Sequence, residues 1–386
     1  MRIAARIAAL RRLRVFAVAG LLAMSSSACG AACEAWPAWE GFRSRFVNEG
    51  GRVIDPGTAT AASHSTSEGQ SYGLFFALVA NDRESFEKIL RWTESNLAEG
   101  DLTARLPAWQ WGKRDDGSWG VMDENAASDS DLWIAYALAE AGRLWKVQKY
   151  TALAQLLADR MLREETVRLA GLGRTLLPGP RGFQPQPGTV RLNPSYLPIQ
   201  LMRRMAALYP QSDWKQLVTT SMDTIVRSSP KGYAPDWIVY KENAGFQPDT
   251  DTKAVGGYNA IRVYLWAGML ADDEPLRTVL LKTFAPMVQH LARQGTPPLD
   301  IDTRQGQGGG VAPAGFSAAL LPFLAASRQD DLFRQQRLRV DAKSPLDRDD
   351  NYYEQALTVF GLGWSEGRYR FARDGALVAR WTCAEK

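Results

Sequence analysis

The sequence predicts an all-α fold, an (α/α)6 barrel with six inner and six outer helices. Three observations predict it. Apolar residues recur at helical spacing through most of the 386 residues. The helical segments come largely in pairs joined by short loops. The first helix of a pair tends to be rich in small and aromatic residues, whereas the second is amphipathic. An inner ring buried on both sides and an outer ring with one solvated face would produce this alternation.

The first 32 residues have the composition of a secretory signal peptide. Five arginines between positions 2 and 14 precede an apolar run from Val15 to Met24 and a small-residue stretch from Ser25 to Ala32. The apolar run is too short to span a bilayer as a stop-transfer helix. We therefore expect export, cleavage near residues 30–32, and no stable membrane insertion of the mature chain.

The mature chain, residues 33–386, is expected to form a single domain, because no long Pro/Ser tract, charge block or low-complexity repeat interrupts it. Ser212 before Asp213, and Pro275 after Glu274, are typical helix starts. The expected helices, in order, are 37–47, 68–80, 84–97, 129–144, 147–163, 195–208, 211–228, 257–270, 274–293, 313–326, 329–340 and 350–364. The longer segments between them, 99–128, 164–194, 229–256 and 294–312, are expected to form the rim of a cleft and to contain some short strands.

Cleavage of the leader changes the charge balance. The whole chain has 46 basic and 42 acidic residues, and loss of the five leader arginines leaves a formal charge of −1. A nucleic-acid-binding surface is therefore not supported. His64 and His290 are the only histidines and lie far apart in the sequence, so neither a zinc site nor a His-based triad is expected. The residue inventory implies no metal or organic cofactor.

Cysteine usage agrees with export. Cys29 is expected to leave with the leader, and Cys33 and Cys383 then remain at opposite ends of the exported domain. In an oxidising compartment this arrangement favours a disulfide between them. Two free thiols are the alternative.

The most informative segment for function is Ser-Glu-Gly-Gln-Ser-Tyr-Gly, residues 67 to 73. It places Glu68 in a small-residue turn at the start of an apolar helix. Taken alone, an acidic residue there is a capping group. Three more segments favour a catalytic interpretation: Ala-Ser-Asp-Ser-Asp-Leu-Trp (127 to 133), Asn-Pro-Ser-Tyr-Leu (193 to 197) and Tyr-Asn-Ala-Ile-Arg-Val-Tyr-Leu-Trp (258 to 266).

In that order, the four segments resemble glycoside hydrolase family 8, and most closely the branch that accompanies bacterial cellulose synthases. The resemblance runs from about Trp36 to the last cysteine. It implies an (α/α)6 barrel, in agreement with the periodicity. It also implies an inverting endo-β-1,4-glucanase that acts on cellulose in a Gram-negative periplasm, as a monomer that could associate with a cellulose synthase complex. The family also contains enzymes acting on mixed-linkage glucan, xylan and chitosan, and loop composition does not separate these substrates.

The resemblance assigns the central acidic residues. Inversion needs an acid for the leaving oxygen and a base on the opposite face of the sugar, with the carboxyls about 6.5–9.5 Å apart. The family's acid is the Glu of the Ser-Glu-Gly motif, here Glu68. Its central aspartate, here Asp129, contacts the sugar next to the cleaved bond. Asp131 is expected either to contact substrate or to cap and support its helix.

Asn259 departs from the family pattern, which places the catalytic base in a Tyr-Asp-Ala-Ile-Arg motif. An amide can orient water but has no useful basicity. Three explanations stay open: a natural variant, a base supplied by Asp249 or Asp251, or a deliberate exchange that traps substrate. A catalytically weak or inactive glucan-binding protein is therefore the alternative function.

Sugar-binding proteins stack aromatic rings on pyranose faces, and this chain has 13 Trp and 12 Tyr. The resemblance implies that Trp109 and Trp111 line subsites and that Tyr196 lies near the cleaved bond. It also implies that Tyr258 flanks the base position and that Arg262 orients its neighbours. Tyr352 and Tyr353 are expected to close the other wall.

Overall fold

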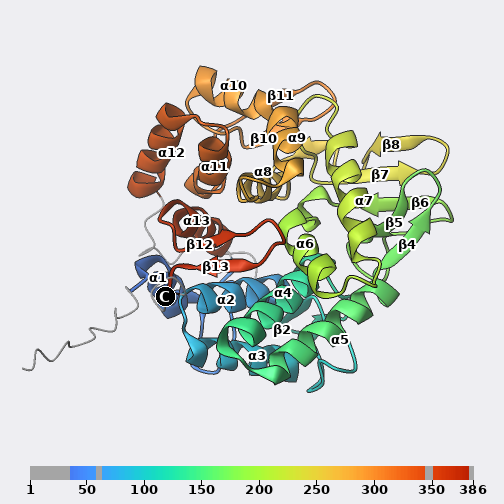
Figure 1. Ribbon diagram of the computed structural model, residues 1–386, viewed down its shortest axis with the longest axis vertical. Helices are drawn as coiled ribbons and strands as arrows, with labels where there is room; N and C mark the ends of the chain where they lie inside the picture. The colour runs from blue at the N-terminus through green and yellow to red at the C-terminus, as the bar shows by residue number, and fades with distance from the viewer. Residues whose placement is uncertain (1–34, 58–62, 344–350, 382–386) are drawn as a thin grey trace, which may run out of the picture. The chain divides into compact units, whose positions relative to one another are not determined.

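The computed structural model describes residues 35–57, 63–343 and 351–381. Within these ranges, thirteen α-helices and one 3-10 turn form two concentric rings, the predicted (α/α)6 barrel (Figure 1). The proposed signal peptide and both disulfide cysteines, Cys33 and Cys383, lie outside the described residues.

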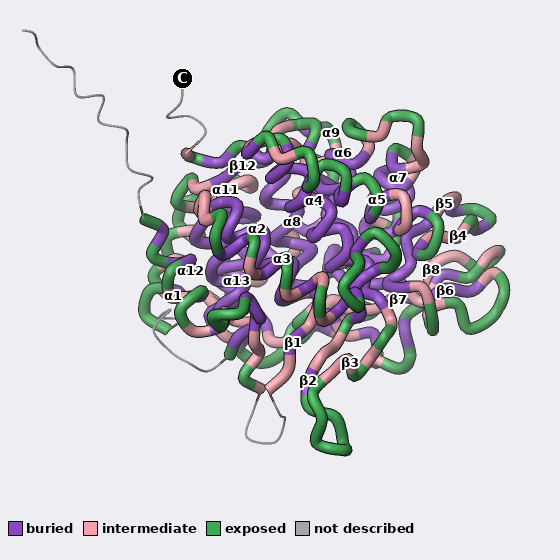
Figure 2. The backbone as a smooth tube through the Cα atoms, turned by 90° about the horizontal axis from the view of Figure 1, so that it is seen from below, coloured by how far each residue is buried: buried purple, intermediate pink, exposed green. Residues whose placement is uncertain are grey.

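The inner ring consists of helices buried on nearly every side. In the first of them, every residue except Glu68 is buried. Figure 2 shows this ring as a largely buried centre beneath an exposed outer layer. The inner helices are α2 (Ser67–Val79), α4 (Ser128–Trp145), α6 (Ile199–Leu208), α8 (Ala260–Gly268), α11 (Ala314–Ala326) and α13 (Tyr352–Ser365).

The outer helices bury one stripe each. In α3, for example, Phe86, Ile89 and Leu90 face inward while charged residues face solvent. The outer helices are α1 (Pro37–Phe46), α3 (Arg83–Leu97), α5 (Gln148–Glu164), α7 (Trp214–Arg227), α9 (Pro275–Thr283), α10 (Ala285–Gln294) and α12 (Asp330–Lys343).

Aromatic rings fill the centre of the barrel. The Phe360 ring of α13 lies 4.6 Å from Phe76, 4.9 Å from Tyr72, 5.4 Å from Trp133 and 5.3 Å from Trp266, measured between centroids. These contacts join α13 to α2, α4 and α8. Large rings in edge-to-face contact add to the stabilisation from area burial alone.

Two predicted helices differ from the structure at prolines. The segment 274–293 is divided at Phe284, which ends α9 and precedes α10, because Pro286 has no N–H to continue the helix. The segment 195–208 begins as the 3-10 turn η1 (Pro194–Tyr196), and α6 starts only after Pro198. Helix α8 is also shorter than predicted, since its first helical residue is Ala260.

Short antiparallel strands occupy all four predicted rim segments, and three further strands, at 64–66, 369–371 and 377–379, lie outside them. One sheet joins β1 (His64–Thr66), β2 (Gln110–Lys113) and β3 (Trp119–Asp123), with His64 opposite Gly112. A second joins β6 (Thr189–Leu192), β7 (Ile238–Lys241) and β8 (Gly245–Pro248), and a third joins β9 (Val255–Gly256), β10 (Asp300–Asp302) and β11 (Gln307–Gly309). Two hairpins complete the strands: β4 (Thr166–Leu169) with β5 (Gly173–Leu176), and β12 (Tyr369–Phe371) with β13 (Leu377–Ala379). The sheets of β1–β3, β6–β8 and β9–β11 lie near the N-terminal ends of inner helices, where the candidate site is found.

Candidate active site

Arg262 is the centre of the site. It lies in the first turn of α8, and its side chain is only 4% exposed. One nitrogen, Nη1, donates to the carboxylate of Glu68, to Asp129 Oδ2 at 3.3 Å and to the Tyr72 hydroxyl at 3.0 Å. A buried guanidinium thus joins acidic residues from α2 and α4.

The second nitrogen of Arg262, Nη2, donates to Ser195 Oγ and to Asn259 Oδ1, each at 2.9 Å. Ser195 gives its own hydroxyl proton to Asn193 Oδ1 at 2.7 Å, which leaves its lone pairs for the guanidinium. Asn193 Nδ2 also donates to Asn259 Oδ1, at 3.1 Å. With two donors on its oxygen, the Asn259 amide is held in one orientation.

Glu68 does not cap α2. Thr66 is the N-cap residue, and its hydroxyl accepts the N–H of Gly69 at 3.1 Å. The Glu68 side chain is 20% exposed and faces Arg262. A capping role, which is the default interpretation of an acidic residue at a helix start, is therefore taken by another side chain. Glu68 is left free for an interaction across the barrel.

Asp129 is nearly inaccessible, with 4% of its side chain exposed. Burial raises the pKa of its carboxyl from the usual 3.8 to about 7; the Arg262 charge opposes this rise and the Glu68 charge adds to it. Its Oδ1 accepts the backbone N–H of Ser130 at 2.8 Å. The Asp129 carboxyl therefore binds a proton close to neutral pH.

Asp131 does not reach the cleft, so the prediction that it contacts substrate is corrected. Its side chain is fully buried and lies beside the equally buried carboxyl of Glu165. No N–H or O–H among the described residues donates to either carboxyl group. Two carboxyl groups can share a hydrogen bond only if one is protonated, and burial raises the pKa of both. Asp131 thus has a structural role in α4.

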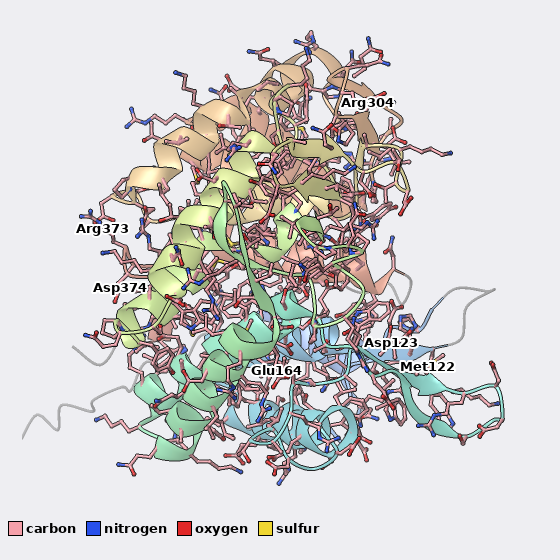
Figure 3. All side chains as sticks on the ribbon, turned by 90° about the vertical axis from the view of Figure 1, so that its right-hand side faces the viewer. Met122, Asp123, Glu164, Arg304, Arg373 and Asp374 are labelled. Atoms are coloured by element: carbon pink, nitrogen blue, oxygen red, sulfur yellow. The ribbon has the colours of Figure 1, made fainter. Side chains whose placement is uncertain are left out.

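An aromatic cleft of about 240 Å³ adjoins the acidic residues. Trp109, Tyr196, Trp237 and Phe183 line it, and Trp109 remains 39% exposed. The Arg262 guanidinium lies 5.7 Å from the Tyr196 ring centroid, which connects the cleft to the centre of the site. Figure 3 shows Asp123, another lining residue, at the end of β3. Exposed rings in a concave site suit the stacking of sugars.

The other predicted aromatics lie in separate places. Trp111 stands between Trp92 and Trp119, with ring centroids 5.4 and 5.2 Å away, and is not among the residues that line the cleft. Tyr353 donates its hydroxyl to the carbonyl of Tyr258 at 2.6 Å, so this pair forms one wall near the base position.

Tyr352 is 5% exposed and packs on Phe42 and Phe46, with centroids 5.8 and 5.5 Å away. It therefore lies beneath the Ser-Glu-Gly turn rather than on a cleft wall, which corrects its predicted position. A Cβ on Gly69 would lie 2.8 Å from the Tyr352 hydroxyl, so the glycine permits this close approach.

Asp249, one of the two carboxylates predicted as a substitute for the missing base, forms hydrogen bonds elsewhere. Asp249 is 3% exposed and accepts hydrogen bonds from Arg191 at 3.1 and 3.2 Å and from the Thr252 hydroxyl at 2.7 Å. These bonds hold the pKa of its carboxyl below the usual value although burial acts in the opposite direction. Asp251 lies exposed on the same loop.

Asp236 and Trp237 are site residues that the sequence interpretation missed. Asp236 Oδ1 accepts the backbone N–H groups of Gly257, Asn259 and Ala260 at 2.8, 3.0 and 2.7 Å. The Arg191 guanidinium lies 4.1 Å from the Trp237 ring centroid. A carboxylate followed by an aromatic residue, directly after Pro235 in a rim segment, is the signal that could have found them.

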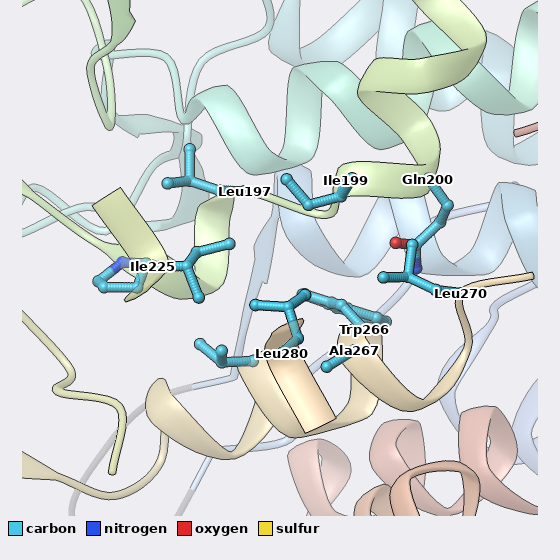
Figure 4. A pocket seen from close by; sticks show the side chains of 10 residues that line it. Leu197, Ile199, Gln200, Ile225, Trp266, Ala267, Leu270 and Leu280 are labelled. Carbon is cyan, nitrogen blue, oxygen red and sulfur yellow. The ribbon is translucent and has the colours of Figure 1, made fainter. Parts of the chain in front are cut away.

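A second cavity lies between η1, α6, α7 and α8 (Figure 4), and its volume is only about 10 Å³. Its lining is apolar apart from Gln200, whose side-chain amide has no hydrogen-bond partner among the described residues. A cavity of this size holds about one water molecule. It is not a site for a sugar chain.

Within the described ranges, no group of three or more His, Cys, Asp or Glu side chains is placed to bind a metal ion.

No helix in the described parts of the chain combines the length and apolar character needed to cross a membrane.

The fold and site define a glycoside hydrolase built on an (α/α)6 barrel. The chain belongs to the family described as "Glycosyl hydrolases family 8", whose profile matches residues 11–367. An endoglucanase of Xanthomonas axonopodis pv. citri (strain 306) is 46% identical over 365 residues, which cover 94% of each chain. An endoglucanase of Escherichia coli (strain K12) is 44% identical over 94% of this chain and 95% of its own. The crystal structure of an endo-1,4-D-glucanase from Vibrio fischeri ES114 matches with a TM-score of 0.84 and 43% identity, covering 90% of this chain and all of that one.

Proposed function

We propose that this protein is an endo-β-1,4-glucanase that hydrolyses cellulose with inversion, using Glu68 as the general acid. The observation that carries the proposal is the position of Glu68. It is the one residue of α2 that is not buried, and it meets Arg262 and Asp129 beside an aromatic cleft. The endoglucanases that this chain resembles at 44–46% identity support the same reaction.

In the proposed reaction, Glu68 gives its proton to the glycosidic oxygen as the bond from that oxygen to the anomeric carbon breaks. A water molecule attacks the anomeric carbon from the opposite face and loses a proton to a base. Asp129 and Tyr196 hold the sugar next to the cleaved bond, and Arg262 keeps both acidic groups in place.

The proposal extends to the setting of the enzyme. The leader composition of residues 1–32 supports export to a Gram-negative periplasm. The resemblance to the cellulose-synthase branch of the family supports an accessory role in cellulose production, as a monomer that could act near the synthase complex.

Release of reducing ends from carboxymethylcellulose tests the proposal. Wild type is expected to release them, and Glu68→Gln should lower kcat by about 10²- to 10⁴-fold, the usual contribution of a general acid. Glu84→Gln, on the exposed face of α3, is the matched control and should keep wild-type activity. A wild type that releases no ends from this polymer, xylan or chitosan at any pH would contradict the proposed catalysis. Release of reducing ends from xylan or chitosan alone would show that the substrate is that polymer and not cellulose.

A glucan-binding protein without turnover is the second candidate, and Asn259 at the family's base position favours it. In that case, calorimetry should show cellopentaose binding without hydrolysis, and Asn259→Asp should create hydrolytic activity. Hydrolysis by wild type would exclude this candidate.

A further inference from the structure

The site has a proton donor but no carboxylate at the usual acceptor position. The Asn259 oxygen is occupied by two donors, Arg262 Nη2 and Asn193 Nδ2. The other end of the amide, its NH2 group, can donate to the oxygen of a water molecule but cannot remove a proton. An inverting reaction in this chain therefore needs an acceptor close to Asn259.

Asp236 is the carboxylate in direct contact with Asn259. Its Oδ1 accepts the backbone N–H of that residue at 3.0 Å, together with the N–H groups of Gly257 and Ala260. These three bonds fix the carboxylate at the start of α8, two residues before Arg262. The position of the group is therefore set by backbone rather than by mobile side chains.

The second oxygen of Asp236 remains free. No hydrogen bond from the described residues reaches Oδ2, and the residue is only partly buried. Gly257 lies beside this oxygen, since a Cβ added to the glycine would be 3.6 Å from Oδ2. Because glycine has no side chain, Gly257 leaves its side of the carboxylate uncovered. One oxygen is thus an anchor and the other is available to a water molecule.

Asp236 shares its surroundings with the proposed acid. Burial raises the pKa of the Tyr353 hydroxyl, and the charges of Glu68, Asp236 and Asp129 all act on that group. The Arg262 charge also acts on Asp236. The charges of both carboxylates therefore act on Tyr353, and hydrogen bonds of Arg262 and Asn259 link the two groups.

We propose that Asp236 is the general base of this enzyme and that Asn259 orients the water it activates; the inference rests on the hydrolysis proposed above. Asn259 Nδ2 donates to the water oxygen, and Asp236 Oδ2 accepts one water proton. The water oxygen forms the new bond to the anomeric carbon while the old bond to the leaving oxygen breaks. Glu68 protonates that leaving oxygen. Both carboxyls return to their starting states after exchange with solvent.

Burial raises the pKa of Asp236 above its usual value, although its three backbone hydrogen bonds oppose the rise. A carboxylate with a raised pKa is a stronger base than an exposed one. This supports the role that the geometry assigns.

The test is Asp236→Asn, whose amide oxygen can still accept the three backbone N–H bonds and so preserve the start of α8. We expect kcat on cellopentaose to fall by about 100-fold or more, with cellopentaose binding by calorimetry and the melting temperature unchanged. Azide, which needs no deprotonation, should restore turnover and give a glycosyl azide of inverted configuration. Asp273→Asn, an exposed change between α8 and α9, is the control and should keep wild-type activity.

A reciprocal exchange sharpens the test. Combining Asp236→Asn with Asn259→Asp moves the carboxylate to the family's position and should recover hydrolysis. Retention of activity by Asp236→Asn alone, with an active wild type, would overturn the assignment while leaving the proposed function intact. Loss of activity without azide rescue would also overturn it and reduce Asp236 to a positioning residue. An inactive wild type would overturn both proposals.

Discussion

At the scale of single residues, one guanidinium holds the site together. Arg262 contacts two acidic residues through Nη1 and two neutral groups through Nη2. Its planar fork reaches elements on opposite sides of the barrel, which an ammonium group cannot do. Removing the fork would leave the buried Asp129 beside Glu68 without a fixed cation.

Arg262→Lys is therefore expected to lower kcat/KM by about 100-fold or more, since it loses preorganised electrostatic contacts. It should also lower the melting temperature. Arg304→Lys is the matched control, because Arg304 is 56% exposed at the molecular surface (Figure 3). Steady-state kinetics on cellopentaose and thermal unfolding check both variants. If Arg262→Lys kept wild-type kinetics, a positive charge at this position would be sufficient for activity and the planar guanidinium would not be required.

Part of this site could be predicted from the sequence. Glu68, Asp129, Asn259 and Arg262 could be named from motifs, and the structure places them together. Asp236 could not, because its role depends on how a rim segment folds against the start of α8. The position of Asp131 could not be predicted either, because a spacing of two residues in the sequence does not reveal that its side chain is buried and faces another acid.

At the scale of elements, helix α4 contains Asp131, one of a buried pair of acidic residues; the other is Glu165. In the folded state, the pKa values of Asp131 and Glu165 both lie well above their ordinary values of 3.8 and 4.5, because burial disfavours their charges. The folded chain therefore binds more protons than the unfolded chain above about pH 4. This contribution to stability is greatest at low pH and is lost as the pH rises toward the folded pKa values.

Asp131→Asn is expected to weaken that pH dependence. The amide can donate to Glu165 without an added proton, so the melting temperature should fall less than in wild type between about pH 5 and pH 8. Asp273→Asn, an exposed change, should keep the wild-type slope. Thermal unfolding across pH measures the effect, and equal slopes in all three proteins would contradict it.

Close packing between inner helices depends on glycine. A Cβ at Gly268 of α8 would lie 2.1 Å from the backbone nitrogen of Phe323 in α11. Gly268→Ala should therefore lower the free energy of unfolding by about 1–3 kcal/mol, as overpacking of a tight core does. Gly50→Ala, where the nearest atom would be Asn48 Oδ1 at 3.5 Å, is the control. Urea unfolding compares them, and equal stabilities would show that the helices can separate slightly.

Helix periodicity predicted the barrel because inner and outer helices differ in how many faces they bury. It did not predict the division at Phe284 or the late start of α6, since prolines fit helix starts as well as breaks. The strands were predicted only in general terms, because rim segments pair through contacts between distant parts of the chain.

At the scale of the whole molecule, the two ends of the described chain lie beside each other. The Arg368 guanidinium donates to the carbonyl of Ala35 at 3.0 Å, and the Arg368 carbonyl accepts the N–H of Arg380 at 2.8 Å. Ala35 is two residues from Cys33 and Arg380 is three from Cys383. The disulfide between Cys33 and Cys383 stays a prediction, because both cysteines lie outside the described residues.

Reduction is expected to lower the melting temperature of the exported protein. In the chain-entropy model, a disulfide that closes so long a loop stabilises by roughly 4–5 kcal/mol. The double variant Cys33→Ala/Cys383→Ala should match the reduced protein and respond no further to dithiothreitol. If wild type melted at the same temperature with and without the reductant, the disulfide would be absent.

The reaction as a whole is tested most directly by proton NMR of cellopentaose during hydrolysis. Acid catalysis by Glu68 and attack by a water on the opposite face predict that the α-anomer of the new reducing end appears first, followed by slow mutarotation. Initial formation of the β-anomer, or no cleavage at all, would contradict inversion at this site.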